Sequence, residues 1–330
     1  MDMATERVIG MRIKYLVLNM TAVMLLISGC AQPEINSTSN TNTSAITEIQ
    51  NQSYDVAQEQ GRHIEKDLKM KDSDIKVNAQ VIVTADQVQQ GKLELVNPSL
   101  KEIENLFEIK YPLEKTDNGY ESFTENNYQG FHVDEDNTFY YENSYVSTGH
   151  LDAETIGSEN FTDQEQDVMD QYAESASECL EALSASVEIQ SQDLEKSGEY
   201  YTGEIMYYET IEGVPLIESI NGQKAFMETH IEMTSLGVET LQMNGGLWQV
   251  KEADPVNVLS VDQLLEIVSK AAEEGTISVW PDTEIDKIQL VYYLDSRSGD
   301  FYPVWCLIQD IDGMEQIEVC VHAVTGDVVY

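Results

Sequence analysis

Cys30 is the residue whose type and position most clearly predict covalent chemistry. It ends the run Leu26-Ile27-Ser28-Gly29-Cys30, behind an almost wholly apolar stretch from Tyr15 to Ile27 that follows the basic residues Arg12 and Lys14. A cysteine sulfur is a nucleophile once it is deprotonated. The apolar stretch is shorter than the about 20 residues of a membrane span and has the size of the apolar core of a signal peptide.

Residues 26–30 resemble the lipobox of bacterial lipoproteins. The resemblance implies a signal peptide over residues 1–29, cleavage between Gly29 and Cys30, and a diacylglycerol-type lipid (palmitate among its chains) on the Cys30 sulfur. Two acyl chains hold a protein on a bilayer where one is marginal. The expected location is therefore the outer, extracytoplasmic face of the cell membrane. An ordinary secretory signal and a transmembrane anchor are the alternatives, and translation could start at Met1 or Met11.

The chain is strongly acidic. The full sequence of 330 residues has a formal net charge of −42. Residues 1–29 contain two acids and three bases, which leaves 15 basic and 58 acidic residues in the expected mature protein. Such a chain repels nucleic acid and anionic lipid headgroups and favours cationic partners or divalent ions. Solubility is the simpler explanation of the charge.

The cysteines beyond Cys30 are few. Cys179, Cys306 and Cys320 are an odd and sparse set, which is not a disulfide framework. Cys306 and Cys320 flank an expected hairpin around Gly313 and could face each other. Buried free thiols are the favoured interpretation, and Cys179, on the apolar face of an expected helix, is not expected to be a catalytic nucleophile.

The expected organisation begins with a flexible tether over residues 30–74. Its Asn/Ser/Thr-rich part, 36–44, cannot form a core, and residues 54–70 could form a marginal helix. An N-terminal α+β subdomain is expected over 75–157, with a strand at 75–85 and a helix opened by a capping box, Ser99 with Glu102.

Residues 158–256 and 257–330 are predicted to be two copies of one unit. Each begins with a capping box, Thr162 with Glu165 and Ser260 with Gln263, and Gly275 suits the end of the second helix. Similar strand patterns follow: Ile205–Tyr208, a glycine and Pro215–Ile217 in the first, and Leu290–Tyr293, a glycine and Pro303–Trp305 in the second. The predicted fold class is α+β, built from duplicated helix-plus-antiparallel-sheet units of PepSY-like or cystatin-like type.

The last unit carries a family resemblance. Residues 260–330 contain Pro303-Val304-Trp305 and end on Ala323-x-Thr325-Gly326-Asp327-Val328. This resembles PepSY-type domains and the carboxy-terminal modules of YycH/YycI-type accessory proteins, and the layout is similar to uncharacterised lipoproteins of Gram-positive, clostridial-type bacteria. The resemblance implies a non-catalytic envelope module linked to peptidase regulation or to modulation of sensor kinases. It transfers no catalytic residue.

Other chemistry is weakly signalled. No two of the histidines are three or four residues apart, and no Gly-x-Ser-x-Gly, Ser-x-x-Lys or phosphate-binding glycine loop is present. Asp134–Asn137 starts like a calcium loop, but Phe139 and Tyr145 stand where glycine and glutamate are needed. The sequence therefore predicts no metal site, no cofactor and no enzymatic activity. The histidines are His63, His132, His150, His230 and His322.

Aromatic side chains in the paired strand motifs are the candidate partner surface. A row of exposed tyrosines would suit a protein or peptide contact, although both faces of the strands could be covered instead. The candidates are Tyr207, Tyr208, Tyr292, Tyr293 and Trp305. The predicted function is a lipid-anchored regulatory or accessory protein that binds an envelope protein or peptide. The alternative is a solute- or cation-binding lipoprotein for calcium or basic peptides. The oligomeric state is open.

Overall fold

The structure, a computed structural model, describes residues 56–69, 74–107, 109–124, 127–134, 137–147, 153–220, 222–277, 279, 283–311 and 314–329. All of them belong to one compact unit that runs from Ile49 to Tyr330. The predicted signal, Cys30 and the 36–44 segment lie outside the described residues, as do His150 and Gly313.

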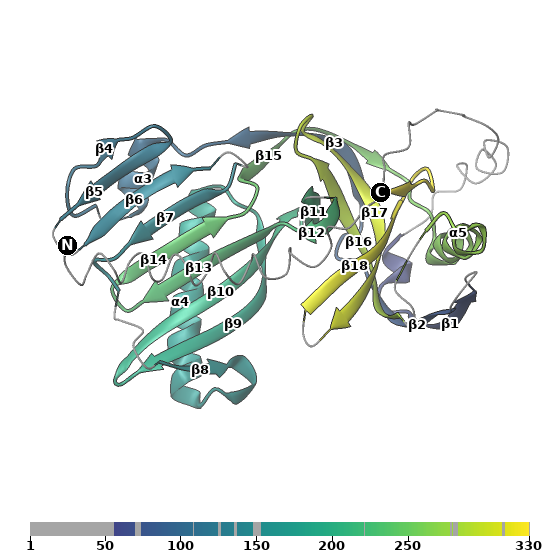
Figure 1. The fold of residues 1–330 in the computed structure, drawn as a ribbon, viewed down its shortest axis with the longest axis horizontal. Coiled ribbons are helices and arrows are strands. Elements are labelled where there is room, and N and C mark those ends of the chain that lie inside the picture. Colours follow the sequence, from purple (N-terminus) through teal and green to yellow (C-terminus); the bar gives the residue numbers. More distant parts are fainter. Residues whose placement is uncertain are drawn as a thin grey trace, which may run out of the picture. The chain divides into compact units, whose positions relative to one another are not determined.

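Strands dominate the described residues (Figure 1), which contain nineteen strands and three α-helices. Hydrogen-bonded pairings connect all the strands, but the ladders divide into two large sheets. Sheet A has ten strands: β1 (His63–Lys69), β2 (Asp74–Ile82), β3 (Val88–Val96), β11 (Val214–Ile220), β12 (Gln223–Phe226), β15 (Leu247–Val256), β16 (Glu284–Asp295), β17 (Asp300–Ile311), β18 (Met314–His322) and β19 (Val328–Val329).

Sheet B has nine strands, all antiparallel to their neighbours. In spatial order they are β4 (Glu114–Lys115), β5 (Gly119–Phe123), β6 (Tyr128–Val133), β7 (Phe139–Asn143), β14 (Gly237–Met243), β13 (Glu228–Thr234), β10 (Tyr200–Ile211), β9 (Val187–Ser197) and β8 (Glu154–Gly157).

Three helices begin at the capping boxes that the sequence predicts. They are α3 (Leu100–Leu106), α4 (Asp163–Ala182) and α5 (Val261–Glu274), with N-caps Ser99, Thr162 and Ser260. In each, the N-cap side chain and the third helical residue satisfy each other's backbone N–H group. Gly275 ends α5 at a φ of 69°, the left-handed conformation that favours glycine.

The helix α5 packs on one face of sheet A. Its apolar stripe, which includes Leu264 and Val268, shares a core with strand residues such as Ile75 and Trp305. Trp305 is fully buried, and its indole N–H donates to the Leu259 carbonyl oxygen at 2.9 Å. A buried indole with this hydrogen bond fixes the segment before α5 over the sheet.

The helix α4 packs on one face of sheet B (Figure 1). Met169 and Leu180 on the helix meet Leu194, Ile205 and Ile231 on the strands, and all five are almost fully buried. Side chains alternate between the two faces of a strand, so the residues next to these on β9, β10 and β13 point away from α4. They form the face described below.

The predicted duplication is wrong. β16 and β17 pair side by side through nine residue pairs, as one antiparallel hairpin. β10 and β11, which carry the matching motif, share only Thr210↔Pro215 and Ile211↔Val214. β11 instead joins sheet A and runs parallel to β16. The protein is mostly β, and the two similar stretches occupy different places in it.

The expected tether also ends earlier than residue 74. A short 3₁₀ helix, η1 (Val56–Glu59), and strand β1 are packed there instead of a marginal helix. β1 pairs with β2 through seven residues, and Leu68 is fully buried. Glu59 accepts a hydrogen bond from the Val261 N–H at the start of α5, which ties η1 to that helix. A second 3₁₀ helix, η2 (Ser158–Asn160), precedes α4.

The other expected boundaries, at residues 157 and 256, stay predictions. The strands of one expected domain are divided between the two sheets. Within 75–157, β2 and β3 lie in sheet A with β16 and β17, whereas β5, β6 and β7 lie in sheet B.

Candidate functional site

A line of carboxylates crosses sheet B. The strand registers place one residue of each strand in this line, in the order Glu114, Glu121, Gly130, Glu142, Thr240, Glu232, Glu204, Asp193 and Gly157. Six of these positions are acidic, and none is basic. We call Glu114, Glu121, Glu142, Glu232, Glu204 and Asp193 the acidic row. At the usual strand spacing, nine strands span roughly 38 Å.

The acidic row lies on the face of sheet B opposite α4. Ile205 and Ile231 are buried against the helix, whereas their neighbours Glu204 and Glu232 are only half-buried. Directly opposite residues in a sheet have their Cβ atoms about 5 Å apart, and like charges in that arrangement repel. Glu204 and Glu232 are such a pair. The face therefore concentrates negative charge.

A second row of side chains runs beside the acidic row on the same face. It carries hydrogen-bonding and aromatic groups but no lysine or arginine. The registers place Gly119, His132, Tyr140, Gln242, His230, Met206 and Ser191 in it. An aromatic pair, Phe123 and Tyr128 with ring centroids 4.9 Å apart, flanks the acidic row on β5 and β6. Phe123 is 68 % exposed, so this end of the face offers apolar contact area.

The pKa values of two groups on sheet B are raised in part by neighbouring carboxylates. Burial raises the pKa of Asp193, and the Glu159 carboxylate adds to the shift. Burial likewise raises the pKa of the Tyr140 hydroxyl, with further contributions from Glu142 and Glu232. A neighbouring negative charge disfavours a second one. The same interactions would favour a cation placed over these residues.

Three side chains on this face converge within metal-binding distance. One ligand atom from each of Glu204, His230 and Glu232 lies within 4.8 Å of the other two. They come from adjacent strands, β10 and β13. An imidazole nitrogen with two carboxylate oxygens is a ligand set that suits zinc or manganese better than calcium, which takes oxygen ligands alone.

The predicted tyrosine surface is not a single exposed row. Tyr207, Tyr292 and Trp305 are buried, the first in the core under α4 and the other two in the core under α5. Tyr208 and Tyr293 are half-buried. Because side chains alternate along a strand, each Tyr-Tyr pair divides between two faces.

The two half-buried tyrosines lie in a third apolar cluster, on the other face of sheet A. Tyr208 stacks on Phe226 with ring centroids 4.4 Å apart, and Tyr293 lies 5.2 Å from Tyr302. The Lys224 ammonium nitrogen lies 5.3 Å from the centre of the Tyr293 ring. These tyrosines fill internal contacts, and little of them is left for a partner.

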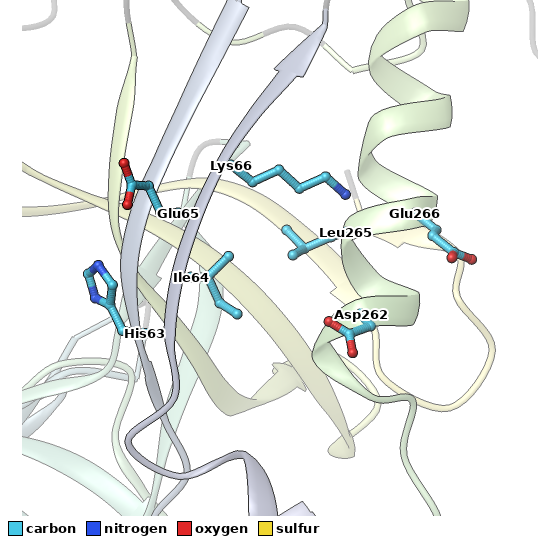
Figure 2. A pocket seen from close by; sticks show the side chains of 7 residues that line it. All are labelled: His63, Ile64, Glu65, Lys66, Asp262, Leu265 and Glu266. Carbon is cyan, nitrogen blue, oxygen red and sulfur yellow. The ribbon is translucent and has the colours of Figure 1, made fainter.

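A shallow pocket of about 440 Å³ lies between β1 and α5 (Figure 2). In Figure 2, Lys66 extends toward α5, whereas His63 and Glu65 point to the other side of β1. Asp262, at the start of α5, is paired with Arg62 at 3.0 Å. The charged groups do not converge on one point, so the pocket offers no reactive or ligand-binding arrangement. Its lining is His63, Ile64, Glu65, Lys66, Asp262, Leu265 and Glu266.

Helical spacing rules miss the Glu204–His230–Glu232 group. Glu228, His230 and Glu232 are two residues apart, which places them on one face of a strand rather than of a helix. The Glu-x-His-x-Glu spacing is the local signal for the group. The pairing of His230 and Glu232 with Glu204 could not be seen, because it depends on the strand register.

No family model and no curated protein matches the chain. An uncharacterised protein from Eubacterium rectale is similar in structure, with 13% sequence identity and a TM-score of 0.48, over 88% of this chain and 99% of that one. YycH from Bacillus subtilis is similar with 11% identity and a TM-score of 0.38, over 77% of this chain and 57% of YycH.

Within the part of the chain that the structure describes, none of the helices has the length and apolar character that a membrane crossing requires.

Proposed function

We propose that the protein is a non-catalytic, lipid-anchored protein of the extracytoplasmic membrane face, and that it binds a basic segment of an envelope protein at the acidic row. The observation that carries the proposal is the alignment of six carboxylates on one face of sheet B, with no basic residue in that row or in the next. The pattern around Cys30 supports the location.

Charge complementarity indicates that the segment bound at the acidic row is cationic. Negative potentials over a surface attract cationic partners and speed their encounter with it. An extended peptide places every second side chain on one side, about 6.6 Å apart. A lysine- or arginine-rich segment that lies along the acidic row can therefore meet several carboxylates in succession. The Phe123–Tyr128 pair at one end adds apolar and cation–π contact.

The free energy that the ion pairs can contribute limits the expected affinity. Exposed ion pairs contribute about 0.2–1 kcal/mol each, so six of them give on the order of 3 kcal/mol. A millimolar dissociation constant already corresponds to about 4 kcal/mol. The ion pairs alone are therefore too weak, and the partner needs aromatic contacts or the increase in effective concentration that comes from sharing a membrane surface. Two-dimensional confinement by a lipid on Cys30 would provide the latter.

The test is a binding titration of the full chain with a fluorescent lysine-rich peptide at low salt. Neutralising three acids of the row, E142Q/E204Q/E232Q, should weaken binding at least fivefold. The matched control E65Q/D67N/E266Q removes the same charge from exposed positions near β1 and α5 and should change it less than twofold. Equal losses in both variants would show a nonspecific effect of net charge and contradict the proposed surface.

Membrane attachment has its own test. Cys30→Ala should move the protein from the membrane fraction of producing cells to the soluble fraction. If the variant still sediments with membranes, the lipid does not anchor the protein.

A divalent cation is the second candidate ligand, and the convergence of Glu204, His230 and Glu232 within 4.8 Å favours it. Calorimetric titration with Zn²⁺, Mn²⁺ and Ca²⁺ would identify it. We expect binding to be lost in His230→Ala and retained in His63→Ala, which changes an exposed histidine on β1. If the heat of metal binding is the same in His230→Ala as in the wild type, the Glu204–His230–Glu232 group is not the metal site.

A further inference from the structure

Cys306 and Cys320 face each other across two neighbouring strands. They are register partners in the antiparallel pair β17–β18, and their Sγ atoms lie 2.7 Å apart. Both side chains are almost fully buried, at 0% and 2% exposure. The described cysteines, Cys179 included, are thiols in this structure.

The hydrogen-bond pattern places this pair at a position that suits a covalent bond. The Ala323 N–H donates to the Pro303 carbonyl oxygen, so these two opposite residues form a hydrogen-bonded pair. Hydrogen-bonded and non-hydrogen-bonded pairs alternate along an antiparallel ladder. Cys306 and Cys320 are three residues farther along, and so form a non-hydrogen-bonded pair, whose Cα atoms are about 4.5 Å apart. That separation lies within the range of disulfides.

The apolar side chains around Cys306 and Cys320 shield the two sulfurs from solvent, whether they are thiols or a disulfide. Apolar side chains of sheet A, among them Ile217, Val291 and Ile308, pack around them. Burial raises the pKa of the Cys306 thiol far above its ordinary value, and the hydrogen bond to Cys320 adds to the shift. Exchange needs the thiolate, so the folded interior slows both oxidation and reduction. The chemistry must therefore occur while the β17–β18 hairpin forms, before it is covered.

Cys179 is an internal control for the oxidation of Cys306 and Cys320. It lies on α4 in the core of sheet B, and burial raises the pKa of its thiol to about 12. The other described cysteines belong to a different core, so Cys179 is expected to stay reduced.

We propose that Cys306 and Cys320 form a cross-strand disulfide in the exported protein. The two thiols lose two protons and two electrons, and one S–S bond forms. The oxidant is a second disulfide, either of an envelope thiol oxidoreductase or of a small molecule, whose S–S bond is reduced to two thiols in the exchange. The inference rests on the extracytoplasmic location of the proposed function, because disulfides persist in oxidising compartments.

The first arm of the test examines the geometry in the purified full chain. The reduced protein is unfolded, refolded with a mixture of reduced and oxidised glutathione, alkylated in denaturant and mapped by mass spectrometry. We expect linked Cys306 and Cys320 peptides with a mass deficit of two hydrogen atoms, and an alkylated Cys179. The bond should resist dithiothreitol in native buffer and be reduced at least tenfold faster in denaturant. Alkylation of Cys306 and Cys320 after refolding would overturn the proposal.

The second arm examines the location. Cells that export the protein are lysed in denaturant with an alkylating agent, so that no thiol can oxidise afterwards. The expected result is again an alkylated Cys179 with linked Cys306 and Cys320, and no linked peptide in Cys306→Ala. Free thiols at both positions would overturn the bond in the cell. If the first arm had succeeded, that failure would lie in the assigned location or its oxidant rather than in the strand geometry.

Discussion

The hydroxyl of Tyr208 donates a hydrogen bond to the carboxylate of Glu315 at 3.0 Å, and this bond joins β10 of sheet B to β18 of sheet A. Lys287 forms an ion pair with the same carboxylate, and the Gln190 side chain donates to the Tyr208 hydroxyl at 2.8 Å. Burial raises the pKa of Tyr208, and the Glu315 charge raises it further. The tyrosine therefore stays a neutral donor throughout the physiological range.

Replacing Tyr208 by phenylalanine should remove this connection and keep the ring stacked on Phe226. A hydrogen bond to a charged group contributes about 1.5–3 kcal/mol, and Lys287 still neutralises Glu315, so we expect a loss of about 1–2 kcal/mol in the free energy of unfolding. Urea titration would measure it. Tyr200→Phe, at a ring that is 60 % exposed, is the control and should change stability by less than about 0.5 kcal/mol. Equal effects in both variants would mean that the contact does not stabilise the fold.

Glu209 should make the protein less stable as the pH rises. Its carboxyl is buried, and burial raises its pKa to about 8, although a hydrogen bond from Thr229 opposes the shift. An unfolded glutamate has a pKa of about 4.3. Between these values the native state holds a proton that the unfolded state has released, so stability falls as pH rises through this window and is lowest above it.

The effect is testable with Glu209→Gln, which keeps the shape and cannot ionise. At about 1.4 kcal/mol per pKa unit, the wild type should lose on the order of 5 kcal/mol across the window because of this residue. The variant should lack that part of the slope in urea titrations from pH 4 to pH 9, and Glu266→Gln should retain it. A variant with the wild-type slope would show that Glu209 is not protonated in the native state.

Helix boundaries were predictable because their signals are local. Ser99, Thr162 and Ser260 each lie three residues before a glutamate or glutamine, and all three open helices. The capping interaction is made within four residues, so no distant contact decides it. The position of Cys179 on the apolar face of its helix follows equally from apolar spacing, since a helix needs only one covered face.

Strand partners were not predictable because they are non-local. β16 lies between β17, its neighbour in sequence, and two parallel partners, β2 and β11, which come from much earlier in the chain. Nothing within the Leu290–Tyr293 motif specifies these partners. The similar motif Ile205–Tyr208 pairs with β9 and β13 instead. The similarity of the two sequence motifs therefore predicted a duplicated unit, but their strands pair with different partners and do not form one.

The candidate site was partly visible in the sequence. The charge of −42 predicts cationic ligands, and the alternation of Glu228, His230 and Glu232 places three polar side chains on one strand face. The acidic row itself requires the registers of nine strands, and a shift of one residue in any of them would turn its carboxylate to the other face. Composition thus favours a cationic ligand, whereas the placement of the candidate surface depends on strand pairing that the sequence does not specify.

Gly203 should be required for the packing of α4 on sheet B. A Cβ atom added there would lie 2.6 Å from Cδ2 of Tyr172, whose hydroxyl is held by a hydrogen bond to the Tyr201 carbonyl oxygen at 3.1 Å. Gly203→Ala should therefore destabilise the protein by about 1–3 kcal/mol, the usual cost of overpacking. In the double variant with Tyr172→Leu the loss should shrink. A Gly203→Ala protein with wild-type stability would show that α4 can shift to make room.

The like-charged pair Glu204–Glu232 should lower the stability of the folded protein. Directly opposite like charges destabilise a sheet, and cross-strand pairs are worth about 0.2–1 kcal/mol. Glu204→Gln should therefore raise the free energy of unfolding by about 0.5 kcal/mol at low salt, and the gain should vanish at high salt because the repulsion is screened. Glu252→Gln is the matched contrast, because Glu252 is the register partner of Lys92: its loss should leave stability unchanged or slightly lower. If Glu204→Gln lowers stability instead, the Glu204 carboxylate is held by stabilising interactions within the protein and the repulsion between Glu204 and Glu232 does not dominate.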